Sequence, residues 1–191
     1  SYSVTFTNVS GCSATSTATT VTVNALPTAP TVSASGSTTF CAGGSVTLTS
    51  SQATGNLWST GATTQSIVVS AAGSYSVTYT NGSGCSATSS ATTVTVNALP
   101  TAPTVSASGS TTFCAGGSVT LTSSQATGNL WSTGSTSNNI SVTASGSYSV
   151  TYTDGNGCTS LSSAATTVTV NPAPVIAIGT VINPTTCATT T

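Results

Sequence analysis

Very few residues of this chain have side chains that can do chemistry. The 191 residues include no lysine, arginine or histidine, one acidic residue, six cysteines and five tyrosines. General acid–base catalysis uses histidine, carboxylates, lysine, tyrosine or cysteine beside the reacting group. No serine has a histidine to complete a serine–histidine–aspartate triad. The composition therefore predicts that the chain is not an enzyme and holds no cofactor.

The single acidic residue, Asp154, lies in the segment Thr-Asp-Gly-Asn-Gly, where related segments carry Asn8 or Asn81 instead. This exchange indicates a turn-forming residue. Calcium sites combine several oxygen ligands, usually with more than one carboxylate, and zinc sites use closely spaced cysteine pairs or histidine. Because the chain has neither pattern, we expect no metal.

The cysteines are regularly spaced. Two pairs are each separated by 44 positions, and the pattern recurs every 73 positions. The six are Cys12, Cys41, Cys85, Cys114, Cys158 and Cys187. Paired cysteines in small domains indicate disulfides formed in an oxidising compartment. The expected location is extracellular, at the cell surface.

The same period appears in the whole sequence, because residues 18–61 recur letter for letter as residues 91–134. A fixed period of this size is the signature of a repeat architecture. It divides the chain into the C-terminal part of one repeat, two complete repeats and the N-terminal part of a fourth. The corresponding ranges are 1–24, 25–97, 98–171 and 172–191. Each complete repeat starts with a proline-containing segment that reads as an extended linker.

Each repeat alternates apolar and polar residues with the period of a β-strand. In the first complete repeat we expect strands at 31–35, 45–49, 56–59, 66–70, 74–80 and 86–97, with a type I′ turn at 81–84. No segment shows a capped helical pattern. Six or seven short strands in about 73 residues indicate a β-sandwich.

Three segments carry a family resemblance: GGSVTLT at 43–49, Trp58, and AGSYSV at 72–77. They resemble strands B, C and F of immunoglobulin-like domains. The stretch from Leu57 to Cys85 also resembles the Ig-like and PKD-like repeats of giant cell-surface and gliding-motility adhesins of Bacteroidetes. The resemblance implies an all-β chain of small Ig-like sandwiches joined end to end by short proline-containing linkers. The expected core anchors are Trp58, Trp131, Tyr75 and Tyr148.

The cysteines depart from the immunoglobulin pattern. Immunoglobulin domains carry them within strands B and F, where this sequence has Ser50 and Val77. Here Cys41 precedes strand B and Cys85 follows strand F. In a full immunoglobulin topology those positions lie at opposite ends of the sandwich, too far apart for a disulfide.

The short spacing between Trp58 and Ile67 favours a tight hairpin that omits a strand and brings the two cysteines of one unit together. We therefore expect the bridges Cys41–Cys85 and Cys114–Cys158, with Cys12 and Cys187 pairing outside this sequence. The alternative retains the full topology and joins Cys41 to Cys158 of the next unit.

The surface chemistry limits the partners. Without basic residues the chain has no electrostatic footprint for nucleic acid, and no apolar run reaches the ~20 residues that span a bilayer. We expect neighbouring repeats as partners, and lateral association between copies as a variant. The expected function is a structural stalk or filament segment of a large adhesin, used in adhesion or surface motility, with length set by repeat number.

The sequence also allows two other functions. One is a carbohydrate- or ice-binding array, which would need an exposed aromatic or threonine platform in every unit. The other is a set of spacer domains in a secreted polysaccharide-degrading enzyme. The solvent exposure of Trp58 tests the aromatic platform directly.

Overall fold

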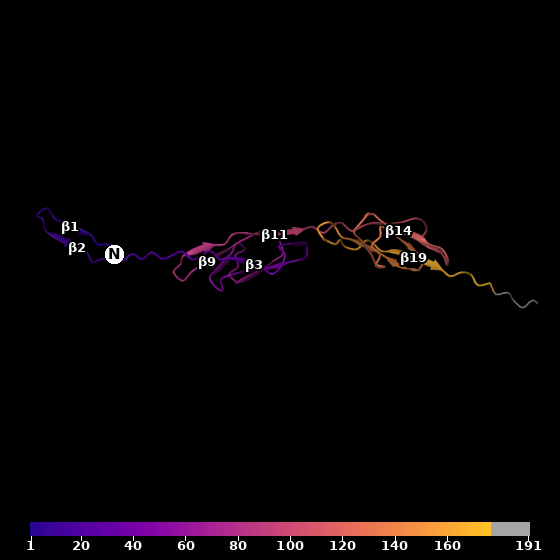
Figure 1. The fold of residues 1–191 in the computed structure, drawn as a ribbon, viewed down its shortest axis with the longest axis horizontal. Coiled ribbons are helices and arrows are strands. Elements are labelled where there is room, and N and C mark those ends of the chain that lie inside the picture. Colours follow the sequence, from indigo (N-terminus) through magenta and orange to yellow (C-terminus); the bar gives the residue numbers. More distant parts are fainter. Residues whose placement is uncertain (177–191) are drawn as a thin grey trace, which may run out of the picture. The chain divides into compact units, whose positions relative to one another are not determined.

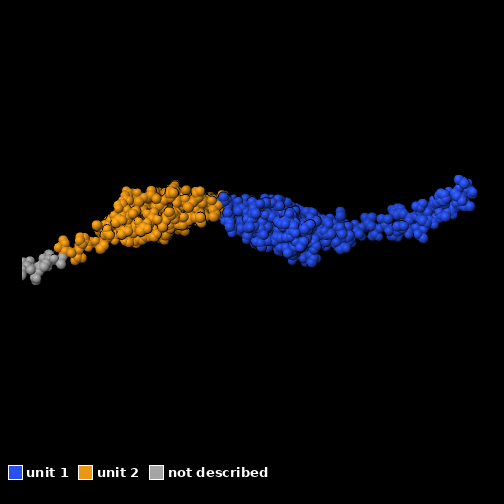
Figure 2. Space-filling model, turned by 180° about the vertical axis from the view of Figure 1, so that it is seen from behind, with its two compact units in different colours: residues 1–98 blue, residues 99–191 orange. Residues whose placement is uncertain are grey.

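The computed structural model describes residues 1–176, which form β-strands and turns without a helix. The chain divides into two compact units, residues 1–98 and 99–191 (Figure 2). Within residues 1–176, no helix has the length and apolar character required to cross a membrane. Most of the predicted fourth repeat, including Cys187, lies outside the described residues.

The first unit begins with a hairpin and continues with a two-layered set of short strands (Figure 1). Its strands are β1 (Thr5–Thr7), β2 (Ser13–Thr15), β3 (Val32–Ala34), β4 (Thr39–Cys41), β5 (Val46–Ser50), β6 (Asn56–Trp58), β7 (Ser66–Val69), β8 (Gly73–Tyr75), β9 (Val77–Thr80), β10 (Ser86–Thr88) and β11 (Thr92–Asn97). Within residues 25–97, for which strands were predicted, β4 is the one that the sequence pattern did not predict.

One layer of the first unit contains the antiparallel strands β3, β5 and β7 in that order. In the other layer, β11 pairs with β4 in parallel and with β8 antiparallel, while β9 pairs with β10 and β6. Strands β8 and β9 are one strand interrupted at Ser76, and β10 and β11 are one strand interrupted at residues 89–91. This is the strand order of an immunoglobulin-like sandwich, so the expected all-β, Ig-like fold is confirmed.

The core of the first unit follows from the alternation of the sequence. Val46 and Leu48 are buried while the threonines between and after them face the other side of the sheet. Trp58 is 2% exposed, and its indole nitrogen donates a hydrogen bond to the carbonyl oxygen of Thr64 at 2.9 Å. Buried tryptophan provides a large apolar contact area if its N–H finds an acceptor, and both conditions are met here.

Tyr75 packs against this core from the second layer. Its hydroxyl donates to the carbonyl oxygen of Ala71 at 3.0 Å, and the Tyr148 hydroxyl donates to the carbonyl oxygen of Ala144 in the second unit at 3.0 Å. A tyrosine at the start of strand F that hydrogen-bonds a few residues upstream is the tyrosine corner of immunoglobulin-like sandwiches. It fixes the loop that joins the two layers.

The second unit repeats this arrangement, with the layers β12–β14–β16 and β13–β19–β17 and the pair β15–β18. Its strands are β12 (Val105–Ala107), β13 (Thr112–Cys114), β14 (Val119–Ser123), β15 (Asn129–Trp131), β16 (Asn139–Val142), β17 (Gly146–Tyr148), β18 (Val150–Tyr152) and β19 (Thr166–Asn171). It has its own core, centred on Leu121 and Trp131.

The connection between β6 and β7 differs from the expected tight hairpin. Strand β6 pairs with β9 in one layer, whereas β7 pairs with β5 in the other. Residues 59–65 therefore cross between the layers, and the amide of Ser50 donates to the carbonyl oxygen of Gln65 at 2.9 Å. Val69 at the end of β7 lies opposite Val46 at the start of β5. Strand β8 therefore begins at the end of the sandwich where β5 begins, and β9 finishes at the opposite end of the sandwich.

The hairpin at 81–84 also differs from the prediction. The amide of Gly84 donates to the carbonyl oxygen of Asn81 at 3.0 Å, and the positive φ (81°) lies at Gly84. A type I′ turn would require positive φ at both central residues, Gly82 and Ser83, and Gly82 is not among the glycines with positive φ. The turn is instead closed by a glycine in the left-handed region just before Cys85.

Candidate functional site

The cysteines occupy the two ends of each unit, which we call the proximal end, where the chain enters, and the distal end, where it leaves. Cys41 is the last residue of β4 and lies opposite Asn97, the last residue of β11. The amide of Ala42 donates to the carbonyl oxygen of Asn97 at 2.8 Å. Cys41 is therefore at the distal end of the first unit.

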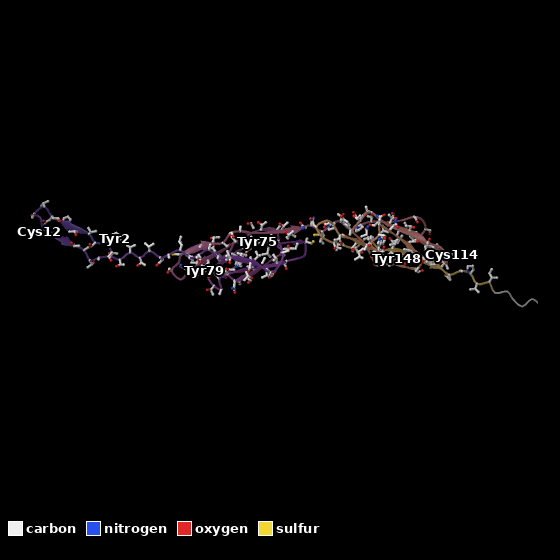
Figure 3. The ribbon with its side chains drawn as sticks, viewed as in Figure 1. Tyr2, Cys12, Tyr75, Tyr79, Cys114 and Tyr148 are labelled. Carbon is white, nitrogen blue, oxygen red and sulfur yellow. The ribbon has the colours of Figure 1, made fainter. Side chains whose placement is uncertain are left out.

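Cys114 has the same position in the second unit. It lies opposite Asn171, and the amide of Ala115 donates to the carbonyl oxygen of Asn171 at 2.8 Å. Figure 3 shows Cys114 at the end of this unit from which the chain leaves. Its side chain is exposed.

Cys85 lies at the proximal end of the first unit. Its amide donates to the Oδ1 atom of Asn81 at 3.0 Å, which closes the turn after β9. The Asn81 Nδ2 atom in turn donates to the carbonyl oxygen of Ala25 at 3.4 Å, and the Cys85 sulfur lies 4.0 Å from the carbonyl oxygen of Asn24. Asn24 and Ala25 are the residues through which the chain enters the folded part of the unit.

The two cysteines of one unit are therefore far apart. Cys85 precedes β10, whereas Cys41 is level with the last residue of β11. At about 3.3 Å per residue along these strands, the separation is roughly 30–40 Å. A disulfide requires Cα atoms within about 7 Å, so one unit cannot bridge its own cysteines.

The disulfide pattern agrees with this geometry and corrects the predicted pairing. Cys41 and Cys158 are both disulfide-bonded, and they are joined to one another. Cys12, Cys85 and Cys114 are free thiols. The predicted bridges Cys41–Cys85 and Cys114–Cys158 are wrong. Strand β9 ends at the proximal end of the unit, so Cys85 lies there, whereas Cys41 lies at the distal end. The alternative considered above, Cys41 with Cys158, is the one that forms.

This pattern predicts which cysteines react with a thiol reagent. In the folded chain without reductant, N-ethylmaleimide should modify Cys12, Cys85 and Cys114 and leave Cys41 and Cys158 unmodified. Peptide mass spectrometry after non-reducing digestion reads out each site. Modification of Cys41 together with protection of Cys114 would contradict the pairing, because it would exchange the bonded and free partners.

Asp154 performs the structural role expected of it. Its Oδ1 atom accepts hydrogen bonds from the amides of Asn156 and Cys158, both at 2.9 Å. This is the turn that Asn81 forms in the first unit. Across residues 1–176, no cluster of histidine, cysteine and acidic side chains has the composition to hold a metal ion. Asp154 therefore supports the position of Cys158.

Each unit also has a shallow hollow beside the outer strand of its three-stranded sheet. The hollow of the first unit has a volume of about 430 Å³ and is lined by β7 and Tyr75, and that of the second unit has about 390 Å³ and is lined by β16 and Tyr148. The tyrosine is the only ionisable lining residue in each, and its hydroxyl already donates to a backbone carbonyl. The hollows offer hydroxyl and aliphatic walls without an acid–base pair.

The tryptophans are not available as a surface platform. Trp58 and Trp131 are each 2% exposed, while the neighbouring Leu57 and Leu130 face solvent at 53% and 52%. A stacking surface for sugars would require β6 and β15 to turn their tryptophans, rather than their leucines, toward solvent.

Comparison with known proteins adds nothing on function. No family description and no curated protein matches the chain. Similar solved structures include a mouse coronavirus receptor-binding domain complexed with its murine receptor, at 14% identity and TM-score 0.40, covering 74% of this chain and 99% of that chain. Another is the human OSCAR ligand-binding domain, at 15% identity and TM-score 0.32, covering 75% of this chain and 100% of that chain. At such identities and scores, the fold assignment rests on the strand order described above.

Proposed function

We propose that this chain is a structural segment of a large extracellular cell-surface adhesin, a stalk or filament used in adhesion or surface motility. Its length would be set by the number of units. The observation that carries the proposal is the disulfide from the distal-end cysteine of one repeat to the proximal-end cysteine of the next. A second covalent connection between successive units is useful to a protein that transmits tension.

The position of this disulfide supports a mechanical role. Tension applied to the two ends of the chain passes from Cys41 through the disulfide to Cys158. Residues 42–157 lie in the closed loop and are not stretched, even if their strands separate. Only the segments before Cys41 and after Cys158 can lengthen. The array would therefore keep its length under loads that unfold ordinary sandwich domains.

The chemistry of the surface fits an extracellular structural part. Disulfides persist in oxidising compartments, and the absence of lysine and arginine leaves trypsin-like proteases no cleavage site. A carbohydrate-binding array built on Trp58 and Trp131 lacks its platform, since both side chains are buried. The ice-binding and enzyme-spacer alternatives have no specific observation in their favour.

Force spectroscopy on the whole chain, held at its two ends, tests the mechanical role. Without reductant, unfolding should release only the short terminal segments. With reductant, the contour length should grow by a further ~400 Å, since the loop contains more than 110 residues at about 3.6 Å each. The Cys41→Ser variant should give the full extension without reductant. A wild-type chain that extends fully in oxidising buffer would contradict the mechanical role.

The cellular part of the proposal needs a separate measurement. An antibody against residues 25–97 should label thin filaments on intact cells of the source organism in electron microscopy. Labelling confined to the cell interior, or to dispersed globular particles in the medium, would overturn the stalk proposal.

A further inference from the structure

We propose that the free thiol of Cys85 is half of a second inter-unit disulfide, whose partner is the distal-end cysteine of a further copy of the unit placed before residue 25. Cys114 would offer the equivalent bond to a copy placed after Asn171. A continuous series of disulfides would then join each unit to the next. This inference concerns covalent architecture and goes beyond the proposed function, because it holds whether or not the array is a stalk.

The local structure around Cys85 is the same as that around its bonded counterpart, Cys158. The Cys85 amide donates to Asn81 Oδ1 at 3.0 Å, and the Cys158 amide donates to Asp154 Oδ1 at 2.9 Å. The carbonyl oxygens of both cysteines accept a bond from the first residue of the turn at 2.9 Å. The backbone of Cys85 therefore already makes the hydrogen bonds that the backbone of the disulfide-bonded Cys158 makes.

The distal-end cysteines match in the same way. The carbonyl oxygen of Cys41 accepts from the amide of Gly44 at 2.9 Å, and that of Cys114 accepts from the amide of Gly117 at 3.0 Å. Both cysteines end a strand that pairs in parallel with the last strand of the unit. Each unit thus has one cysteine at its proximal end and one at its distal end. The Cys41–Cys158 disulfide joins a distal-end cysteine to a proximal-end cysteine.

The segment that leads into each complete unit is also identical. Residues 24–30 and 97–103 both read Asn-Ala-Leu-Pro-Thr-Ala-Pro. Cys85 is therefore reached through the same joint as Cys158. The segment after Asn171 reads Pro-Ala-Pro instead, so Cys85 is the better position for a test.

Side-chain burial separates bonded from free cysteines. Cys158 is fully buried, whereas Cys85 is partly exposed. At the distal position Cys41 is partly buried, whereas Cys114 is exposed. The free thiols are accessible to a partner and to an exchange reagent.

The bond would form by thiol–disulfide exchange. One cysteine thiolate attacks a disulfide donor, such as oxidised glutathione or a disulfide-exchange protein, to give a mixed disulfide and one released thiol. The second cysteine thiolate then displaces the other donor sulfur. The two cysteines lose two protons and two electrons, and the donor is reduced to two thiols.

The test uses a longer chain in which a copy of residues 25–97 replaces residues 1–24, so that the joint before the original unit keeps its sequence. The substitution Thr28→Lys is made in the original unit only, at an exposed position of the linker that joins it to the copy. It creates the only trypsin site, because the chain has no lysine or arginine. After oxidation in a glutathione buffer and digestion, the two tryptic fragments should remain joined on a non-reducing gel in most molecules. They should separate when reductant is added.

Matched variants decide the outcome. With Cys85→Ser the joined fraction should fall to none, and with Cys114→Ser it should be unchanged. Fragments that separate without reductant in the parent chain would overturn the proposal. Alkylation gives an independent measurement. Cys85 of the original unit, which lies in the second tryptic fragment, should be protected in the longer chain and modified in the 191-residue chain. Equal modification in both chains would also overturn the proposal.

Discussion

Replacing Gly128 with alanine is expected to destabilise the second unit by about 3 kcal/mol or more. Gly128 has φ +73°, and a Cβ added there would clash with the carbonyl oxygen of Thr153. The Thr153 amide also donates to the carbonyl oxygen of Gly128 at 2.8 Å. The close approach holds the loop before β15 against the end of β18, and thereby the turn that carries Cys158.

Gly134 is the matched control in the same unit. It has φ +85°, but no atom lies within 4 Å of an added Cβ, so Gly134→Ala should cost only about 1–2 kcal/mol for the left-handed backbone. Denaturant unfolding followed by Trp131 fluorescence in a Trp58→Phe background measures both. Equal losses for the two variants would show that the steric contact at Gly128 has no effect.

The second large effect is expected at Trp58. Trp58→Ala removes the largest buried side chain of the first unit, together with its hydrogen bond to Thr64. Truncation of a core tryptophan costs about 3–5 kcal/mol, which is much of the stability of a small domain. The first unit should therefore be largely unfolded under conditions where the wild-type unit is folded.

The measurement can separate the two units, because the remaining Trp131 reports only on the second. In reductant, far-UV circular dichroism should lose the transition of the first unit while the Trp131 fluorescence transition is unchanged. Leu57→Ala on the same strand, at a side chain that is 53% exposed, should change stability by no more than about 0.5 kcal/mol. A Trp58→Ala variant as stable as Leu57→Ala would contradict the core assignment.

Much of the sandwich could be predicted from local sequence patterns. The alternation of Val46, Thr47, Leu48 and Thr49 specifies a strand with one buried face, and burial follows it residue by residue. Such signals are local, because each strand shows which face it buries. They place the strands correctly without saying which strands pair.

The errors came from non-local features. Strand β4 is three residues long and pairs with β11, more than 50 residues later, so no short window reveals it. Its position at the distal end is what separates Cys41 from Cys85. The crossing of residues 59–65 between the layers likewise depends on pairing of β7 with β5, which the length of the connection alone does not determine. The expected tight hairpin at this connection therefore suggested the wrong disulfide partners.

The disulfide between successive repeats is the central claim, and cleavage of the linker between them tests it most directly. Thr101 is exposed between the two units, and Thr101→Lys gives the 191-residue chain its only trypsin site. After digestion of the oxidised protein, a Cys41–Cys158 bond predicts one species on a non-reducing gel that divides in two when reductant is added. Two separate fragments without reductant would contradict the claim.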